Sequence, residues 1–498
     1  MDVGPVHARA RDSFFADRHA DLALPRVCRG ISCLLIGGGA GERAGQPGRP
    51  IQCAGYCDRS PAVLRPDGSV ATRDSSVPLA PLPEIRSLAR HAIVTGRIAR
   101  GDHRALARAR EAGVWRALED AVQGEPASVL RALEASGERG RGGAGFPTGT
   151  KWRHAAQAPG REKYVIANGD EGDPGSFIDR VLLESDPHAV LEGLALCAFA
   201  VGARHGIVYV RSEYPRAAEQ IESAIREARA AGLLGASVAG SDFAFDVRVA
   251  LGEGSYVCGE ETALIAALEG RRGEVRVRPP HPTASGLFGL PTVVNNVETL
   301  VSVGWILSHG PAAYRALGTP ASRGTKAICL NAGFARPGIV EVEFGASLRD
   351  LIENAAGGAR AGERLAAVAL GGPMGSVLLP DDWDVPVCYE ALSARGIELG
   401  HGGLVALPAG TDFRALARDW LAFMADESCG KCVPCRVGSR RAHELASADT
   451  RAADAALLPL LDAVSAASLC AFGQSIPAPV RTILTRLVPG FAPDEGGR

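Results

Sequence analysis

Two kinds of hydrophobic spacing take turns along the middle of the chain. Short apolar runs such as KYVIANG and HGIVYVR are typical of buried strands, whereas the stretches between them place apolar residues at helical spacing. Strands and helices are expected in the order 163–169, 180–201, 205–211, 215–231, 245–251 and 259–268. This alternation predicts an α/β fold with a mostly parallel sheet covered by helices, in which ligands collect beyond the carboxyl ends of the strands.

The regions beside this alternation have a different character. Residues 323–400 hold short strand-like segments and one helical segment at 348–354, which predicts a small α+β module. From Asp412 onward the pattern is helical and rich in alanine. The alanine- and arginine-rich stretch 88–115 is expected to be helical too. A chain of 498 residues is expected to form about three domains.

The charge balance excludes several classes of function. The 54 basic and 56 acidic residues give a formal charge of -2, so no overall positive field would attract nucleic acid or an anionic membrane. The best apolar candidate, 189–210, is interrupted by Glu192, Arg204 and His205 and does not qualify as a membrane span. The first residues carry no secretion signal. We expect a soluble, cytoplasmic protein without nucleic-acid partners or direct membrane insertion.

The twelve cysteines form two groups of four and four singletons. In the last 70 residues, ESCGKCVPC gives a C-x2-C-x2-C pattern, and a fourth thiol follows in SLCAFGQS. Three thiolates at this spacing suit one face of a [4Fe–4S] cluster whose fourth iron takes a remote ligand. A structural zinc site and unligated thiols are the alternatives. The predicted ligands are Cys429, Cys432, Cys435 and Cys470.

A glycine-rich stretch, ERGRGGAGFPTGTKW at 138–152, is the candidate for binding a phosphate-bearing cofactor. Backbone N–H groups of such a run accept phosphate, and neighbouring basic side chains add complementary charge. The stretch matches neither a P-loop nor a G-x-G-x-x-G turn, and taken alone it could be a flexible hinge. Three more segments place acidic or amide side chains at strand or helix ends, namely ANGDEGDPGSFIDR (167–180), GSYVCGEETALIAALEG (254–270) and GLFGLPTVVNNVETL (286–300).

Together with the cysteine pattern, these motifs resemble the flavin- and NADH-binding subunit of respiratory complex I and its soluble relatives. Those relatives are the diaphorase subunits of NAD-linked hydrogenases and formate dehydrogenases. The resemblance covers about residues 125–480. It implies a Rossmann-like FMN and NAD domain at 86–320, a β-grasp (ubiquitin-like) module at 321–408 and a helical bundle with the [4Fe–4S] cluster at 409–498.

The resemblance also implies which residues meet the cofactors, with no side chain acting as catalytic acid, base or nucleophile. The glycine loop would pass over the FMN, acidic and amide side chains would bind its ribityl chain and ring edge, and Lys151 would reach its phosphate. The implied cofactor-binding residues are Gly140, Arg141, Gly142, Gly143, Ala144, Gly145, Lys151, Asn168, Asp170, Glu171, Asp173, Tyr256, Gly259, Glu260, Glu261, Asn295, Asn296 and Thr299.

Four residues are assigned to the NAD channel: Phe146, Phe177, Arg278 and His281. The two phenylalanines could equally be core residues. His281 stands where the family carries a phenylalanine that stacks on adenine. The acidic pair in GEET, placed near the adenosine ribose, implies a preference for NAD over NADP, because a carboxylate repels a 2′-phosphate.

The first 60 residues carry the second group of cysteines, Cys28, Cys33, Cys53 and Cys57. Their C-x4-C and C-x3-C spacings resemble the [2Fe–2S] site of the thioredoxin-like subunit that partners this family. Relatives place a helix and a strand between the two pairs, and the tract GGGAGERAGQPGRP is too rich in glycine and proline to predict either. We expect a truncated thioredoxin-like domain at 1–85 that holds a [2Fe–2S] cluster, with empty thiols or zinc as alternatives.

The function implied is an FMN-dependent NADH:acceptor oxidoreductase subunit that exchanges a hydride with NAD(H) and single electrons with iron–sulfur clusters. Expected partners are other subunits of a redox complex, including a [2Fe–2S] thioredoxin-like subunit and one that oxidises the terminal substrate. Asp173 in DEGDPGSF, where many complex I subunits have glutamate, favours a soluble formate dehydrogenase or hydrogenase. The alternatives are the NADH-oxidising subunit of complex I and a scaffold that has lost its flavin.

Overall fold

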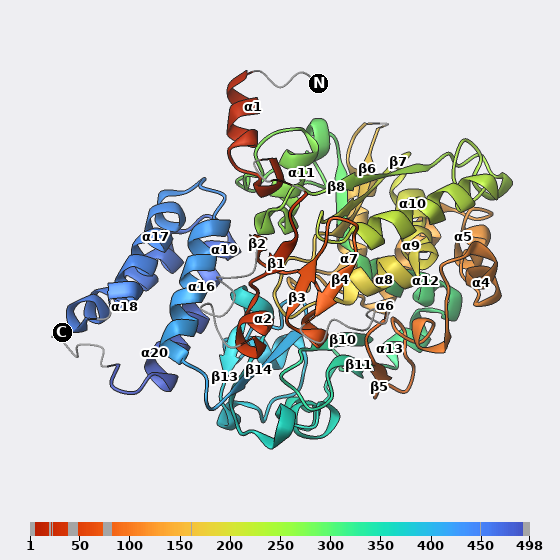
Figure 1. Ribbon diagram of the computed structural model, residues 1–498. Coiled ribbons are helices and arrows are strands. Elements are labelled where there is room, and N and C mark those ends of the chain that lie inside the picture. The colour runs from red at the N-terminus through yellow and green to blue at the C-terminus, as the bar shows by residue number, and fades with distance from the viewer. Residues whose placement is uncertain are drawn as a thin grey trace.

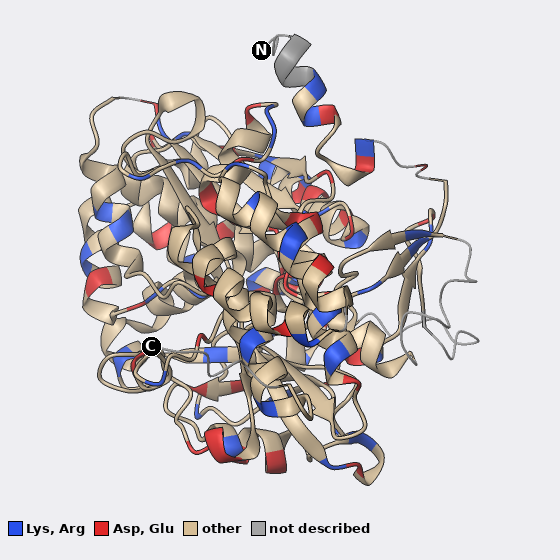
Figure 2. Cartoon of the chain, turned by 90° about the vertical axis from the view of Figure 1, so that its left-hand side faces the viewer, with Lys and Arg blue, Asp and Glu red and all other residues tan. Residues whose placement is uncertain are grey.

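A computed structural model describes residues 5–18, 21, 23–37, 48–72, 82–160, 162–448 and 450–491. Three sheets and a helical bundle are packed around one another (Figure 1). The N-terminal strands lie between the C-terminal helices and the rest of the molecule in this view. Acidic and basic residues are interspersed in the view of Figure 2, in keeping with the balanced charge.

The parallel sheet predicted from the alternating pattern is confirmed. Its order is β8-β7-β6-β9, and all three neighbouring pairs run parallel. The central strands are apolar and buried because helices cover the sheet, as parallel sheets require. The strands are β6 (Tyr164–Gly169), β7 (His205–Val210), β8 (Asp246–Leu251) and β9 (Thr292–Asn296).

The helices of this unit follow the prediction with one exception. The segment 180–201 is not a single helix, because Pro187 begins a new one after Asp186. Proline has no N–H and suits the first position of a helix, so it starts α9 rather than continuing α8. The helices are α4 (Leu106–Glu111), α5 (Arg116–Ala121), α6 (Pro126–Ser136), α7 (Thr148–Gln157), α8 (Ile178–Ser185), α9 (Pro187–Val201), α10 (Pro215–Ala230), α11 (Glu261–Leu268), α12 (Val297–His309) and α13 (Pro311–Arg315).

The second sheet is built mainly from the predicted α+β module. Its order is β13-β12-β14-β10-β11-β5, with β10 and β11 antiparallel and β14 parallel to β10. A short helix, α14 (Leu348–Asp350), continues into a wider turn over Leu351–Ala355, close to the predicted helix. The strands are β5 (Ile85–Ser87), β10 (Thr325–Leu330), β11 (Gly338–Glu343), β12 (Leu365–Leu370), β13 (Ser376–Leu378) and β14 (Gly403–Pro408), and α15 (Tyr389–Ser393) precedes β14.

The stretch 88–115 is mostly not helical, which corrects the prediction. Apart from a single turn at Ile98–Arg100, the only helix within it is α4. The fully buried carboxylate of Glu341 accepts the N–H groups of Ile93, Val94 and Thr95 at 2.7 to 3.0 Å. These hydrogen bonds replace those of a helix and hold the stretch against the second sheet.

The N-terminal sheet has the order β2-β1-β3-β4. Strands β1 (Arg26–Cys28) and β2 (Arg49–Ile51) are parallel and connected through α2 (Ile31–Ile36), and β3 (Ala62–Leu64) pairs antiparallel with β1 and β4 (Val70–Thr72). The expectation of no strand before the second cysteine pair was therefore wrong. Arg49 and Pro50, at the end of the glycine-rich tract, begin β2; residues 38–47 lie outside the described part of the chain.

The C-terminal part is the predicted helical bundle. Its helices pack around Leu421, Leu457, Leu461 and Ile483, all at most 1% exposed. No helix among the described residues is long and apolar enough to cross a membrane. The helices are α16 (Phe413–Glu427), α17 (Val433–Ala448), α18 (Arg451–Ala467), α19 (Ala471–Ser475) and α20 (Pro477–Leu487), and α1 (Pro5–Asp12) begins the described chain.

Candidate functional site

The predicted cofactor segments meet at the carboxyl ends of β6 and β9. Asn168 and Asn296, the last polar residues of these strands, lie side by side in the register. The Asn168 amide donates to the carbonyl of Gly259 at 2.8 Å, which brings in the segment before α11. The Asn296 side chain accepts the N–H of Glu298 at 2.9 Å and caps α12. In parallel α/β sheets, ligands bind beyond the carboxyl ends of the strands, which is where these residues lie.

The glycine loop lies against the start of α12. The N–H of Arg141 donates to the Thr299 hydroxyl at 2.9 Å, and a Cβ at Gly142 would lie 3.2 Å from that of Asn296. Gly143 has a φ of +120°, and a Cβ there would lie 3.4 Å from the backbone of Gly400. The chain can follow this path only with residues that tolerate such a φ and such close backbone contacts.

The Arg141 side chain points away from the open site and contacts residues behind the glycine loop. Its guanidinium is fully buried, pairs with Glu138 at 2.6 Å and hydrogen-bonds the Arg323 carbonyl at 2.9 Å. It also lies over the Phe344 ring, 4.6 Å from the centroid. Lys151 instead carries a positive charge on the open side. It is 24% exposed, donates to the Val294 carbonyl at 3.0 Å and lies 3.9 Å from Glu261.

Two more predicted residues support the site from within. Asn295 is buried, with its amide 3.9 Å from the Cys197 sulfur. Glu171 is buried as well, and its carboxylate caps α8 by accepting the N–H groups of Asp179 and Arg180 at 3.2 and 3.1 Å. Their side chains thus orient the polar groups around them.

The wall opposite the glycine loop is formed by Asp170, Asp173 and Tyr256. The Tyr256 hydroxyl donates to Asp173, and a Cβ at Gly172 would lie 2.6 Å from the Tyr256 ring. Burial raises the pKa of Asp170 well above its usual range, and burial raises that of Asp173 too. Arg211, from the end of β7, lies 3.5 Å from the Asp170 carboxylate.

The acidic pair before α11 has two separate tasks. Glu260 caps α11 by accepting the N–H groups of Thr262 and Ala263 at 2.9 and 3.0 Å, while its Oε1 is buried without a hydrogen-bond partner. Glu261 pairs with Arg278 at 2.9 Å. Arg278 lies 3.7 Å from Glu260 Oε1, at ion-pair distance, so this oxygen can still accept a hydrogen bond from a ligand.

The NAD-channel residues divide into two sets. Phe146 is 47% exposed beside the glycine loop, and Arg278 and His281 are exposed too. Phe177 is fully buried in the main core, with its N–H 3.3 Å from the Cys329 sulfur. This burial agrees with the alternative that Phe177 is a core residue, because the start of α8 turns the ring into the protein.

These residues fit an FMN. The glycine loop presents bare backbone packed against Asn296 and Gly400. Lys151 and Asn168 offer donors for phosphate and hydroxyl groups, and the Glu260 oxygen that makes no hydrogen bond can accept a hydroxyl. Two cavities of about 670 and 410 Å³ lie elsewhere, on the side of α12 that carries Trp305 and His309, and none of the predicted cofactor residues lines them.

The C-terminal cysteines converge where α16, α17 and α19 meet. Cys435 lies in the first turn of α17, Cys470 precedes α19, and the Ser428 hydroxyl is 3.2 Å from the Cys435 sulfur. Burial raises the pKa of the Cys435 thiol to about 12. Backbone N–H groups of Phe472 and Gly473 point at the Cys470 sulfur. Four gathered thiols with N–H donors suit a [4Fe–4S] cluster, which binds them as thiolates.

The N-terminal cysteines also gather, in a buried cluster. The sulfurs of Cys53 and Cys57 are 3.7 Å apart, and Cys28 hydrogen-bonds both Cys33 and Cys53. Hydrogen bonds from Cys28 and Cys57 lower the pKa of Cys53 well below its usual range. All twelve cysteines are within the described residues, and none forms a disulfide.

Comparisons with known proteins agree with this site. The Nuo51 FMN-binding domain matches residues 133–305, and the NADH-ubiquinone oxidoreductase-F iron–sulfur binding region matches 415–492. The HndC subunit of the NADP-reducing hydrogenase of Solidesulfovibrio fructosivorans is 43% identical over 71% of this chain and 73% of its own length. The second F-type subunit of the NADH-quinone oxidoreductase of Rhizobium meliloti is 44% identical over 66% and 78%.

A solved structure extends the likeness to nearly the whole chain. The NAD+-reducing [NiFe]-hydrogenase in its H2-reduced state contains a chain that superposes with a TM-score of 0.80 at 34% identity, covering 97% of this chain and 87% of that one. Fold and site define an NAD-dependent flavin and iron–sulfur oxidoreductase subunit. The chain belongs to the family of Nuo51 and the F-type subunits of NADH-ubiquinone oxidoreductase, with FMN, NAD and a [4Fe–4S] cluster as cofactors.

Three residues of the site were missed from the sequence. His401 contacts Glu171 and Asp179, Arg211 faces Asp170, and Glu427 accepts the N–H of Tyr256 at 2.9 Å. Burial raises the pKa of Glu427 to about 7. Arg211 could have been found from its position at the carboxyl end of a predicted strand. The other two come from distant segments whose approach only the fold reveals.

Substituting Gly143 by valine should abolish FMN retention while the [4Fe–4S] cluster stays. The branched side chain would strain a backbone at φ +120° and press on Gly400. Flavin absorbance of the purified variant is the measurement. Gly160→Val is the matched control, because Gly160 has a φ of +105° with open space around it. Normal flavin content in Gly143→Val would remove the loop from the cofactor site.

Substituting Cys432 by serine should leave flavin reduction by NADH intact and stop electron transfer to acceptors beyond the cluster. The reason is that the thiolate is a predicted cluster ligand and lies outside the flavin walls. Stopped-flow flavin bleaching and iron content measure the two steps. Cys388→Ser, at a buried cysteine of the second sheet, is the control. If Cys432→Ser reduced a one-electron acceptor as fast as the unaltered chain does, the cluster would not lie on the route of electrons to that acceptor.

Proposed function

We propose that the chain is the NAD(H)-reactive FMN subunit of a soluble hydrogenase- or formate dehydrogenase-type complex, with a second, [2Fe–2S] cluster in its N-terminal domain. The observation that carries the proposal is the position of the N-terminal cysteines against the flavin site. The N–H of Gly175 hydrogen-bonds the Cys57 sulfur, and the Arg180 side chain donates to the Gly55 carbonyl at 2.9 Å. A redox centre here is adjacent to the segment that builds one flavin wall.

The strand orders support the finer fold assignments. A parallel pair joined through a helix, followed by an antiparallel hairpin on the inner strand, is the arrangement of a thioredoxin-like sheet, and β2-β1-β3-β4 has it. The order β11-β10-β14-β12-β13, with β14 parallel to β10, is that of a β-grasp module. In this assignment β5 is an extra strand at the edge of the β-grasp sheet, where it pairs with β11. Residues 85–87 therefore belong to this sheet although they precede the strands of the flavin domain in sequence.

The likeness to a solved hydrogenase chain supports the soluble type of complex. That chain superposes on 97% of this one at 34% identity, so its similarity reaches into the N-terminal domain. Asp173 in place of glutamate favours the same group, as expected from the sequence. Formate and hydrogen would both require another polypeptide to handle the terminal substrate.

FMN supplies the conversion between a two-electron hydride and single electrons. The chain's own residues position the reactants. Phe146 and the Glu261–Arg278 pair lie at the open side, where the dinucleotide would bind. The ring centroids of Tyr256 and Phe472 are 5.7 Å apart, and Phe472 lies two residues after the cluster ligand Cys470. Hydride transfer and electron transfer both depend on distance and orientation, which the packed side chains of the site fix.

Exposed apolar residues around the [4Fe–4S] ligands support a partner subunit that receives or delivers the electrons. Val433 is 60% exposed, Val437 54% and Leu469 38%, and each lies within two residues of a ligand cysteine. Exposed apolar side chains grouped at a redox centre suit a contact that excludes water between two proteins.

The type of complex is tested by purifying the assembly through a tag on this chain. We expect it to contain a substrate-oxidising subunit and to reduce NAD with hydrogen or with formate. Assays with each donor distinguish the two cases. Recovery with membrane subunits, and activity with quinone alone, would assign the chain to respiratory complex I. A purified chain without a flavin absorbance band would instead identify a scaffold.

The second cluster is tested by iron and acid-labile sulfide content of the isolated chain. We expect about six iron atoms, since the two clusters hold two and four, and about four in Cys53→Ser. Cys258→Ser, at a buried cysteine outside both groups, should keep six. About four irons in the unaltered chain would leave the N-terminal cysteines empty, and zinc in place of the missing iron would identify the other alternative.

A further inference from the structure

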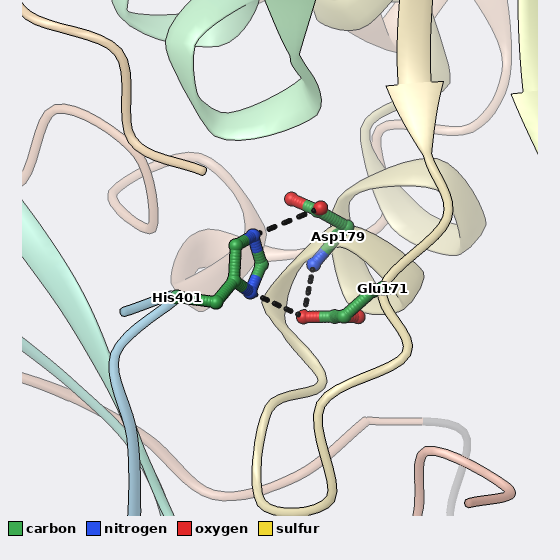
Figure 3. A group of neighbouring side chains, drawn as sticks. All are labelled: Glu171, Asp179 and His401. Atoms are coloured by element: carbon green, nitrogen blue, oxygen red, sulfur yellow. Dashed lines mark hydrogen bonds and ion pairs between the residues drawn. The ribbon is translucent and has the colours of Figure 1, made fainter. Parts of the chain in front are cut away.

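His401 is a buried histidine enclosed by two buried carboxylates. It lies in the turn before β14, and Figure 3 shows its ring between Glu171 and Asp179. Its Nδ1 is 3.2 Å from Glu171 Oε1, and its Nε2 is 3.1 Å from Asp179 Oδ2. The Asn296 amide donates to the same Asp179 oxygen at 2.6 Å and lies 2.9 Å from Nε2. Glu171 and Asp179 come from one stretch, 167–180, and His401 comes from a distant part of the chain.

The geometry is that of an ion-paired imidazolium rather than of a metal site. The three groups are close enough for an ion, but the two carboxylates face different nitrogens of the ring. A doubly protonated ring can donate to both carboxylates, and in that state the Asn296 amide donates to Asp179 and not to Nε2. Burial alone would lower the pKa of His401, yet Asp179 and Glu171 raise it well above its usual range.

The cluster touches three walls of the flavin site. Gly400, the preceding residue, is the backbone that a Cβ on Gly143 would meet at 3.4 Å, so the histidine is adjacent to the glycine loop. Asn296 caps α12, and Glu171 caps α8. Without the imidazolium, two buried carboxylates would face each other with no positive charge between them, which is a costly arrangement.

We propose that His401 is a positioning residue of the flavin site. Its imidazolium holds Glu171, Asp179 and Asn296 in place beside the glycine loop and supplies a positive charge that favours the more negative, reduced form of FMN. The inference rests on the flavin site described above.

The proposal carries a pH dependence. The groups facing His401 are Glu171 and Asp179, with Asp173 acting on it through space and Lys326 acting on Asp179 from β10. Because the folded pKa of His401 is raised, its contribution to stability is complete below about pH 6.5, the unfolded value, and is lost as pH rises through the folded value. When the ring is removed, a proton on one carboxylate can replace the lost charge at low pH only.

The test compares His401→Gln with the unaltered chain, both with clusters loaded. We expect FMN to dissociate about tenfold more readily from the variant, and the preference for reduced over oxidised FMN to fall about tenfold at pH 8, or about 30 mV for two electrons. At pH 6 the second effect should be smaller. His188→Gln is the control, because His188 is fully buried but lies beside Trp115, on α9. It should lose stability and keep both flavin properties.

Unchanged FMN affinity and potential in His401→Gln at both pH values, with flavin still lost from Gly143→Val, would overturn this proposal and leave the flavin site standing. Flavin retained in Gly143→Val would instead contradict the site itself. A stoichiometric divalent cation other than iron, absent from His401→Gln, would replace the imidazolium with a metal centre.

A second variant keeps the proposal testable if His401→Gln does not fold. Asp179→Asn preserves the shape of the carboxylate and removes one charge, so it should lower the pKa of His401. In the FMN-free chain, the thermal midpoint should still begin to fall near the unfolded pKa, but the pH at which this fall ends should move downward. An unchanged profile would contradict the ion-paired state.

Discussion

The segment between β6 and α8, residues 170–177, is the constraint on which the rest of the structure depends. It contacts the N-terminal domain, the second sheet and Tyr256 within a few residues. A Cβ at Gly30 would meet Pro174 at 3.3 Å, one at Gly403 would meet Gly175 at 2.8 Å, and one at Gly172 would meet the Tyr256 ring at 2.6 Å. The N-terminal domain, the second sheet and the wall next to the bundle therefore all pack against this one segment.

Such close contact leaves little room for water, so the charges along the segment are paired within the protein. Arg211 donates to the Glu171 carbonyl at 2.7 Å and approaches Asp170, while His401 lies between Glu171 and Asp179. Buried charges are costly unless they are paired and hydrogen-bonded. The walls of the flavin site are consequently held by a connected polar network, and the glycine loop rests against it through Gly400.

The parts predicted from the sequence are those fixed by local pattern. The parallel sheet followed from the alternation of β6 to β8 with helices, and the bundle from the spacing after Asp412. The errors came where a distant residue decides local structure. Glu341 takes over the N–H groups that would have made 93–95 helical, and pairing with β1 extends Arg49 and Pro50.

The candidate site divides in the same way. The sequence motifs identified the backbone segments of the site, including the loop at Gly143. They did not show which side chains face the ligand. Arg141 and Phe177 carry no local signal that their side chains turn inward, because burial depends on Phe344, Cys329 and the second sheet. His401 could not have been assigned, since a lone histidine between glycines acquires its role only from the carboxylates that the fold brings to it.

The central claim is that the glycine loop, the 170–177 segment and the turn before β14 form one flavin site. Hydrogen–deuterium exchange of the FMN-free chain, with and without added FMN, tests it most directly. The account predicts slower exchange in peptides covering 140–146, 168–174 and 399–402 together, with no change around Trp305 and His309. Protection of the glycine loop without any at 399–402 would contradict it.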